Sequence, residues 1–264
     1  MANWLDVNAT KNQIRKLFKE KKESISHFGS KINQVFEAFV FCATIRWYED
    51  QGWDVTIHNP VDKDTGQPSK VVRLKFSTRG KPSNYSYASC QKGDSIVEVR
   101  HQLRVATYAE RGPYLNANIC LDVAVIEPDE DGVQNFKSEH AAPNGWLMTF
   151  GEAKHMSAYA ELIASFIGMV HELQPHRLKR VRRGNWNKDH PAPFLYVSGT
   201  LYATAKAIVK TIEQRRYDID VYSETTELAR GFSVSKKDPA PKKKKSKKRN
   251  SGRRKVKKRG TGNG

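Results

Sequence analysis

The stretch Trp146-Leu147-Met148-Thr149-Phe150-Gly151-Glu152-Ala153-Lys154 is a short apolar run that ends on an acidic and a basic residue. Its apolar part has the length and composition of a β-strand. Side chains two residues apart on a strand point to the same face, so we expect Glu152 and Lys154 to project together. The stretch therefore predicts a strand whose end presents a carboxylate beside an ammonium group.

A second apolar run, Cys120-Leu121-Asp122-Val123-Ala124-Val125-Ile126, consists mostly of β-favouring residues and carries one acidic residue. If the two runs pair as an antiparallel hairpin, the start of the first lies beside the end of the second, which places Asp122 next to Glu152. Two carboxylates and an ammonium group on one sheet face are costly unless a divalent cation and an anionic substrate complete the charge balance. Hydrolysis of a phosphodiester needs that set of groups.

The neighbouring segments predict further elements of an α/β fold. Before the two strands we expect a buried helix over Ile32 to Ala43 that contains Glu37, and a strand over Ser95 to Thr107. After Lys154, apolar residues at helical spacing predict a helix. The expected segments that follow are a helix over Ser157 to Leu173, a strand over Pro193 to Ser198, a helix over Thr200 to Arg216 and a strand over Asp218 to Tyr222.

This order of elements, with its acids and its Glu-x-Lys, resembles the PD-(D/E)XK nuclease superfamily over Lys31 to Ser223. The resemblance implies a mixed central β-sheet flanked by helices, with a restriction-endonuclease-like core in the order α-β-β-β-α-β. It divides the chain into an N-terminal helical extension (residues 1–30), a nuclease domain (31–235) with an insertion at about 54–94, and a C-terminal tail (236–264). Within the insertion, Asp54 to His58 and Val71 to Phe76 read as strands.

The resemblance also implies an activity, that of a metal-dependent endonuclease. Asp122, Glu152 and the Ala153 carbonyl would hold Mg²⁺ or Mn²⁺ through hard oxygen ligands. Lys154 would act on the attacking water and on the phosphate. Glu37 would bind a second metal ion or a metal-bound water. We expect nucleic acid as the substrate, and DNA rather than RNA.

The pair Pro128-Asp129 matches the literal Pro-Asp of the family name and offers a different acid for the site. Asp129 lies seven residues beyond Asp122, so at ~3.3 Å per residue it would lie roughly 20 Å from Glu152, at the turn end of the hairpin. We therefore assign the site to Asp122. The connection from Glu127 to Gly145 is long and acidic for a hairpin, which leaves the pairing of the two strands open.

Other readings of the same residues remain. Glu152 and Lys154 could be a solvated ion pair at the end of a strand. A non-catalytic nucleic-acid-binding protein could use the same fold, with the acids in structural roles. A variant of the nuclease hypothesis is an effector of bacterial antiviral defence that is silent until a nucleotide, a protein partner or self-assembly into a homo-oligomer activates it.

The charge of the chain is concentrated at its C-terminal end. Residues 236–264 contain 15 Lys or Arg residues and one acidic residue, Asp238, and so carry +14 of the formal net charge of +18. A segment of Lys, Arg, Ser, Pro and Gly without aromatic residues cannot bury enough apolar surface to fold, so we expect it to be disordered. It predicts a polycationic arm that binds phosphate backbones, with its densest cluster at Lys242, Lys243, Lys244 and Lys245. Solubility, an anionic membrane surface or nuclear import would use the same composition.

A second basic cluster follows the helix after Lys154 and is a candidate for positioning a duplex, although a charged surface loop is an equal alternative. Its members are Arg177, Lys179, Arg180, Arg182 and Arg183. The three cysteines, Cys42, Cys90 and Cys120, have no zinc-like spacing and are expected to be buried thiols in a reducing compartment. With no signal peptide and no apolar run long enough for a bilayer, we expect a cytoplasmic protein that does not bind membranes.

Overall fold

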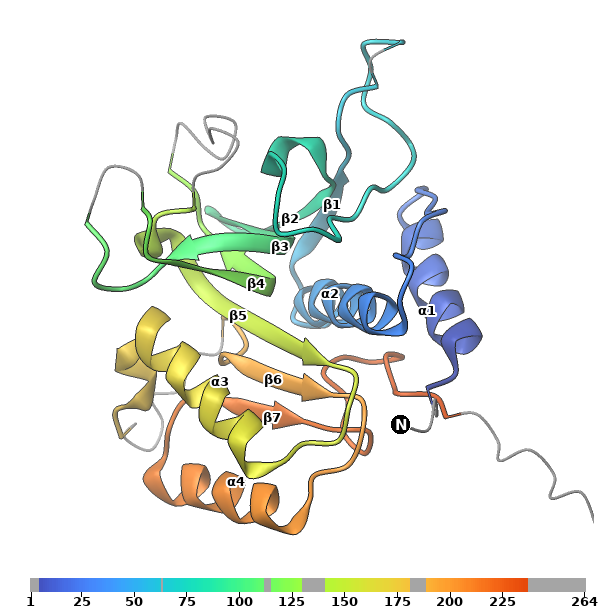
Figure 1. Ribbon diagram of the computed structural model, residues 1–264. Helices are drawn as coiled ribbons and strands as arrows, with labels where there is room; N and C mark the ends of the chain where they lie inside the picture. The colour runs from blue at the N-terminus through green and yellow to red at the C-terminus, as the bar shows by residue number, and fades with distance from the viewer. Residues whose placement is uncertain (1–4, 63, 112–114, 130–140, 181–188, 237–264) are drawn as a thin grey trace, which may run out of the picture.

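The computed structural model describes residues 5–62, 64–111, 115–129, 141–180 and 189–236. They form an α/β fold in which helices cover both faces of a seven-stranded mixed sheet (Figure 1). This confirms the expected mixed central sheet flanked by helices. The helices are α1 (Val7–Glu20), α2 (Ile32–Asp50), α3 (Ala160–Leu173) and α4 (Ala203–Arg215). The strands are β1 (Asp54–His58), β2 (Tyr87–Lys92), β3 (Ser95–Ala106), β4 (Asn118–Ile126), β5 (Leu147–Lys154), β6 (Phe194–Val197) and β7 (Asp220–Tyr222).

The strands follow one another across the sheet in chain order. From β1 to β5 each neighbour is antiparallel, whereas β5, β6 and β7 are parallel. Parallel neighbours need a crossover connection, and here α3 joins β5 to β6 while α4 joins β6 to β7. The elements α2, β3, β4, β5, α3 and β6 thus occur in the order that the sequence predicts.

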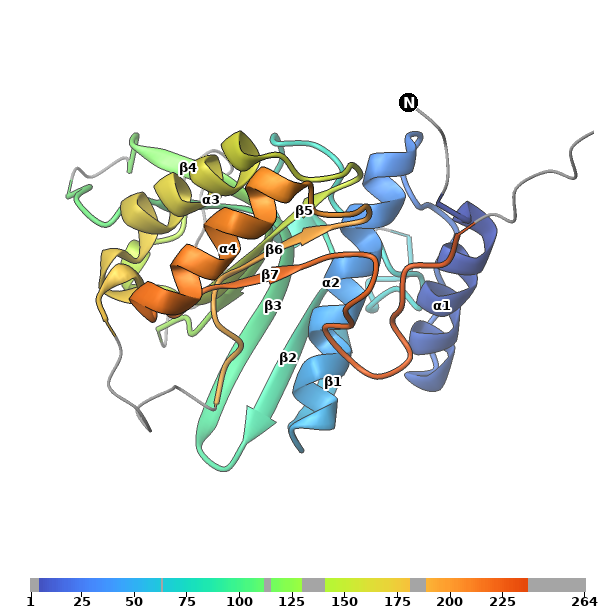
Figure 2. The same ribbon diagram turned by 90° about the horizontal axis from the view of Figure 1, so that it is seen from below.

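Two hydrophobic cores lie on the two faces of the sheet. Helix α2 packs on one face and is apolar almost all round, as expected for a helix with few exposed residues. Helices α3 and α4 lie side by side on the other face (Figure 2). β5 and β6 pack closely at Gly151, because a Cβ there would lie 2.3 Å from the ring of Phe194 on β6.

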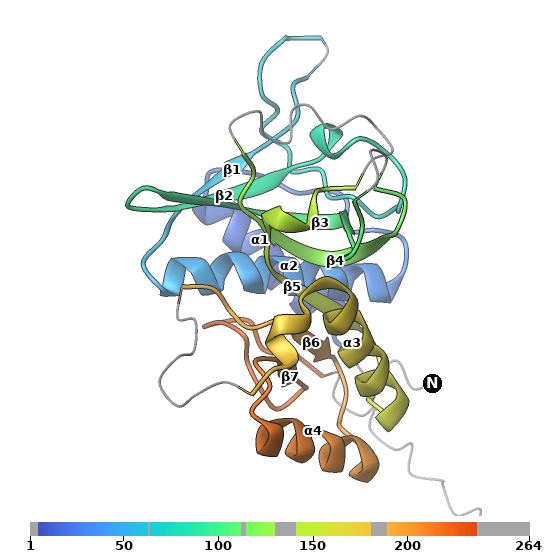
Figure 3. The same ribbon diagram turned by 90° about the vertical axis from the view of Figure 1, so that its left-hand side faces the viewer.

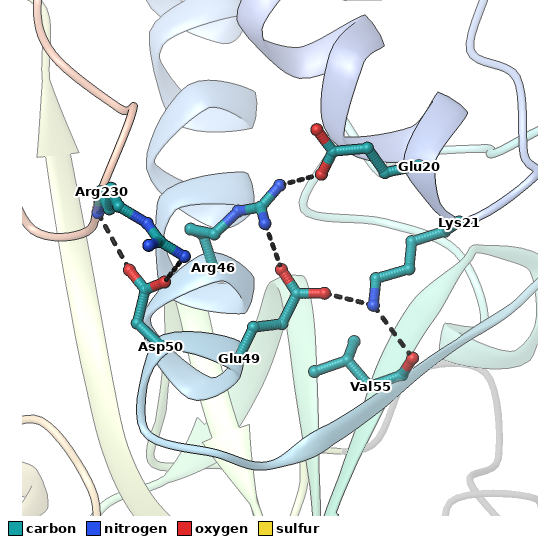
Figure 4. A network of polar contacts seen from close by, with 7 residues as sticks. All are labelled: Glu20, Lys21, Arg46, Glu49, Asp50, Val55 and Arg230. Carbon is teal, nitrogen blue, oxygen red and sulfur yellow. Dashed lines mark hydrogen bonds and ion pairs between the residues drawn. The ribbon is translucent and has the colours of Figure 1, made fainter.

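Helix α1 belongs to the same core as α2, through Ile14, Leu17 and Phe18. Ion pairs link the ends of the two helices (Figure 4). Arg46 of α2 pairs with Glu20 of α1, and Lys21 pairs with Glu49. Residues 5–30 are therefore part of the folded body.

The segment after β7 returns to the start of the chain. Leu228 and Phe232 are buried in the α2 core, and Arg230 pairs with Asp50 at the end of α2 (Figure 4). Lys236 pairs with Glu224 at 2.6 Å and forms a β-bridge with Leu5. Lys236, the expected first residue of the tail, is therefore held by the folded body, and residues 237–264, including Lys242 to Lys245, lie outside the described residues.

The region 54–94 corrects the sequence-based prediction. β1 is confirmed, but Val71 to Phe76 is not a strand: it is part of the long connection between β1 and β2 (Figure 3), and Val71 forms an isolated β-bridge with Ser24. The second strand is instead β2, which pairs with both β1 and β3 and extends the sheet. The buried residues of β2, Ala88 and Cys90, are small and favour a strand only weakly. The strand forms because its backbone is hydrogen-bonded to β1 and β3.

None of the helices among the described residues is long and apolar enough to cross a membrane.

Candidate active site

Strands β4 and β5 bring the two predicted acids together. Their backbone ladder runs from Ile126 opposite Leu147 to Val123 opposite Gly151, so the next positions along it are Asp122 and Glu152. Beyond the ladder, the Asp122 side chain binds the backbone of β5: its Oδ2 accepts a hydrogen bond of 3.0 Å from the Ala153 N–H. The hairpin register expected for Asp122 is confirmed.

Lys154 lies between the two carboxylates. Its Nζ forms an ion pair with Glu152 and lies 3.5 Å from Asp122 Oδ2. The side chains of Asp122 and Glu152 are each 11% exposed, whereas the lysine side chain is 37% exposed. The acids are therefore buried, and the ammonium group closes the site toward solvent.

Glu37 of α2 reaches the same group of side chains through a glutamine. Gln102 Nε2 donates to Glu37 Oε2 at 3.0 Å and approaches Asp122 Oδ1 at 3.4 Å. Gln102 has a left-handed backbone conformation (φ 56°), and its carbonyl accepts from the buried Lys75 Nζ at 2.9 Å. No local pattern distinguishes Gln102 or Lys75, because an isolated glutamine on a strand and an isolated lysine in a connection are common in any sequence.

Burial and the charge of Asp122 shift two glutamates, Glu37 and Glu152, toward protonation. Burial, followed by the charge of Asp122, raises the pKa of Glu37 to about 7. Burial and Asp122 likewise raise the pKa of Glu152 to about 7, and the Lys154 ammonium offsets this only in part. Although burial opposes it, the two carboxylates raise the pKa of Lys154. A further positive charge nearby would therefore stabilise the ionised forms of Glu37 and Glu152.

The residues present fit a divalent cation. Glu152 Oε2 is buried and has no hydrogen-bond partner among the described residues, which is costly for a carboxylate oxygen. Carboxylate oxygens and backbone carbonyls are the ligands that Mg²⁺ or Mn²⁺ takes. Within the described part of the chain, no three His, Cys, Asp or Glu side chains meet as a ready metal site. The expected ligands of the first metal ion include two acidic side chains, Asp122 and Glu152. Glu37 is connected to them through Gln102.

Comparison with known proteins adds no family. No protein family model matches this chain, and no curated protein sequence matches it.

The second basic cluster is only partly where the sequence predicts it. Arg177 is buried, pairs with Asp218 and donates to the Met148 carbonyl at 3.2 Å. It links the turn that follows α3 to β5 and to the segment before β7, so its guanidinium is used internally and is poorly placed for the expected contact with nucleic acid. Lys179 and Arg180 are exposed, while Arg182 and Arg183 lie outside the described residues.

The contacts of Gln102 lead to a mutational prediction. Gln102→Gly relieves the left-handed backbone and removes the amide that bridges Glu37 and Asp122, so the fold should persist while the acids lose their orientation. We expect Mn²⁺ affinity and cleavage to fall by roughly 10- to 100-fold, as when a partner of a metal ligand is lost. Calorimetry and a cleavage assay measure the two effects. Gln91→Gly on β2 is the control, and equal losses in both variants would contradict the assignment.

The raised pKa values of Glu37 and Glu152 predict how stability depends on pH. Because each folded-state pKa is about 7 against an ordinary 4.5, the stability they contribute is complete below pH 4.5 and is lost as pH rises through about 7. In EDTA, Glu37→Gln or Glu152→Gln should therefore lose less free energy of unfolding than the parent between pH 5 and pH 8. Urea denaturation at both pH values measures this. The exposed Glu161→Gln should follow the parent, and parental behaviour of both site variants would refute the charge burial.

Proposed function

We propose that the chain is a metal-dependent nuclease with a restriction-endonuclease-like core of the PD-(D/E)XK type. One observation carries the proposal: Asp122, Glu152 and Lys154 meet where the β4–β5 ladder ends, and one buried oxygen of Glu152 lacks a partner among the described residues. The element order α2-β3-β4-β5-α3-β6 supports it. A phosphodiester of nucleic acid, with DNA favoured, is the proposed substrate.

The roles of the residues follow from their places. Asp122 and Glu152, with the Ala153 carbonyl, would bind Mg²⁺ or Mn²⁺, which supplies Lewis acidity and a more acidic water. Asp122 is held for this task by the Ala153 N–H. Lys154, which reaches from the buried acids toward solvent, would orient the attacking water and stabilise charge on the phosphate oxygens. Glu37, oriented by Gln102, would bind a second metal ion or a metal-bound water.

The alternative, a nucleic-acid-binding protein without activity, gives the acids structural roles. The geometry supports this alternative less well than it supports the nuclease. A structural ion pair is expected to satisfy both carboxylate oxygens, because an unpaired buried oxygen lowers stability. Glu152 Oε2 has no such partner in the described part of the chain. Cleavage of DNA with Mg²⁺ or Mn²⁺ and its loss in EDTA decide between the two.

The polybasic arm gives a prediction for the substrate. Removal of residues 237–264, which spares Lys236 and its pair with Glu224, deletes 14 Lys or Arg residues from the chain. DNA affinity should fall, and the slope of log affinity against log salt should become shallower by roughly 0.9 for each lost phosphate contact on duplex DNA. Single-turnover cleavage at saturating protein should change little. Titrations at several salt concentrations measure the slope. An unchanged slope would mean that the arm does not contact phosphates and has another function.

A further inference from the structure

Tyr159 and Tyr202 form an exposed aromatic pair outside the candidate active site. Their rings stack with centroids 4.7 Å apart and an angle of 28° between the planes. They are 50% and 46% exposed, respectively. Large aromatic rings are normally buried, and paired aromatic rings left at the surface are typical of binding sites.

The backbone fixes this pair in place. Tyr159 directly precedes α3 and Tyr202 directly precedes α4, and the loops leading to them from β5 and β6 run side by side (Figure 1). Tyr202 N–H donates to the Ala158 carbonyl at 3.1 Å. Gly199 makes this approach tight, because a Cβ there would lie 2.5 Å from Ser157 Oγ. The two rings are therefore presented by a rigid double loop.

The same double loop leads directly from the candidate active site. Ser198 N–H donates to the Lys154 carbonyl at 3.0 Å, so the double loop starts at the proposed catalytic lysine. Tyr159 follows Lys154 by five residues, which limits their Cα separation to about 18 Å. At 3.4 Å per base along a strand, that is about five bases or fewer.

The charge around the pair suits a phosphate backbone. Lys206 and Lys210 are exposed on α4, one and two turns after Tyr202, on the same side of that helix. Glu161 in the first turn of α3 is the exposed acid nearest to Tyr159 in the chain. Aromatic rings beside cations are the means by which proteins hold single-stranded nucleic acid, because every base has a face that can stack.

We propose that Tyr159 and Tyr202 form a stacking platform for an unpaired base of the strand whose phosphate lies at Lys154. The platform rests on the proposed nuclease function and narrows its substrate to single-stranded nucleic acid or to a duplex with a splayed end near the scissile phosphate. A fully paired duplex offers no exposed base face there. The protein should therefore bind and cleave a strand with unpaired bases better than a blunt duplex.

Binding in EDTA tests the platform without cleavage. The probe is a labelled single-stranded DNA oligonucleotide that contains 2-aminopurine, whose fluorescence falls on stacking. Tyr159→Ala and Tyr202→Ala should each weaken binding by roughly 5- to 150-fold and lessen the quenching, while blunt-duplex affinity stays within about twofold. Tyr159→Phe and Tyr202→Phe keep the ring and should bind like the parent.

The matched control is Tyr108→Ala. Tyr108 is 52% exposed, and its N–H binds the Glu172 carbonyl near the far end of α3, about 20 Å along the helix from Tyr159. Parental binding by both platform alanine variants, equal weakening by Tyr108→Ala, or no single-strand binding by the parent would overturn the proposal. Tyrosine-dependent binding by a protein that cleaves nothing would retain the platform and reject the nuclease. Cleavage by the parent together with binding that does not depend on the two tyrosines would retain the nuclease and reject the platform.

Discussion

Lys154→Ala should lower nucleic-acid cleavage by at least ~100-fold, which is a typical loss for a polar catalytic group. The lysine Nζ pairs with Glu152 and lies 3.5 Å from Asp122, yet its side chain is 37% exposed. If a metal ion binds the two acids, the lysine can therefore move away from them and contact water and phosphate. Single-turnover assays at saturating Mn²⁺ measure the effect on chemistry rather than on metal binding.

Two controls separate this role from a structural one. Loss of Lys154 leaves two buried carboxylates without their ammonium partner, so circular dichroism must show that the variant is folded. Lys16→Ala, on the exposed side of α1, removes an equal charge from the surface and should change the single-turnover rate little. A folded Lys154→Ala protein that cleaves at the parental rate would show that the lysine is not catalytic.

Asp122→Asn should reduce cleavage by orders of magnitude and weaken Mn²⁺ binding. The substitution keeps the shape of the side chain and its contact with the Ala153 N–H, but removes one of two metal-binding charges. Asp129→Asn is the matched control. Asp129 is exposed and lies past the end of β4, seven residues from Asp122, so at ~3.3 Å per residue it is roughly 20 Å away.

Calorimetry with Mn²⁺ and a cleavage assay, run on both variants, give a clear outcome. We expect Asp129→Asn to behave like the parent in both measurements. A silent Asp122→Asn beside an inactive Asp129→Asn would overturn the site as assigned here, although the strand register itself would stand.

The sequence predicted those parts of the fold in which local pattern and long-range pairing agree. The continuous apolar run of α2 and the β4 and β5 runs are buried in the structure as their composition predicts. Asp122 was placed beside Glu152 by hairpin geometry alone, and the register from Val123 opposite Gly151 confirms it.

The errors have a common physical cause, which is a partner distant in the sequence. Arg177 reads as a surface cation until Asp218, 41 residues later, is placed against it. Val71 to Phe76 alternates like a strand, but its neighbours are Ser24 and Ser86 rather than a ladder. Gln102 acquires its role from Glu37 and Asp122, which no local pattern connects.

Metal-dependent cleavage tests the central claim most directly. Single-stranded DNA, plasmid DNA and a structured RNA are incubated with the purified protein in Mg²⁺, in Mn²⁺ and in EDTA, with Asp122→Asn run alongside. We predict cleavage of the DNA with either metal, fastest for the single strand, none in EDTA and at least ~100-fold less with the variant. Intact DNA and RNA under every condition, or cleavage that persists in EDTA and in Asp122→Asn, would contradict a nuclease built on Asp122, Glu152 and Lys154.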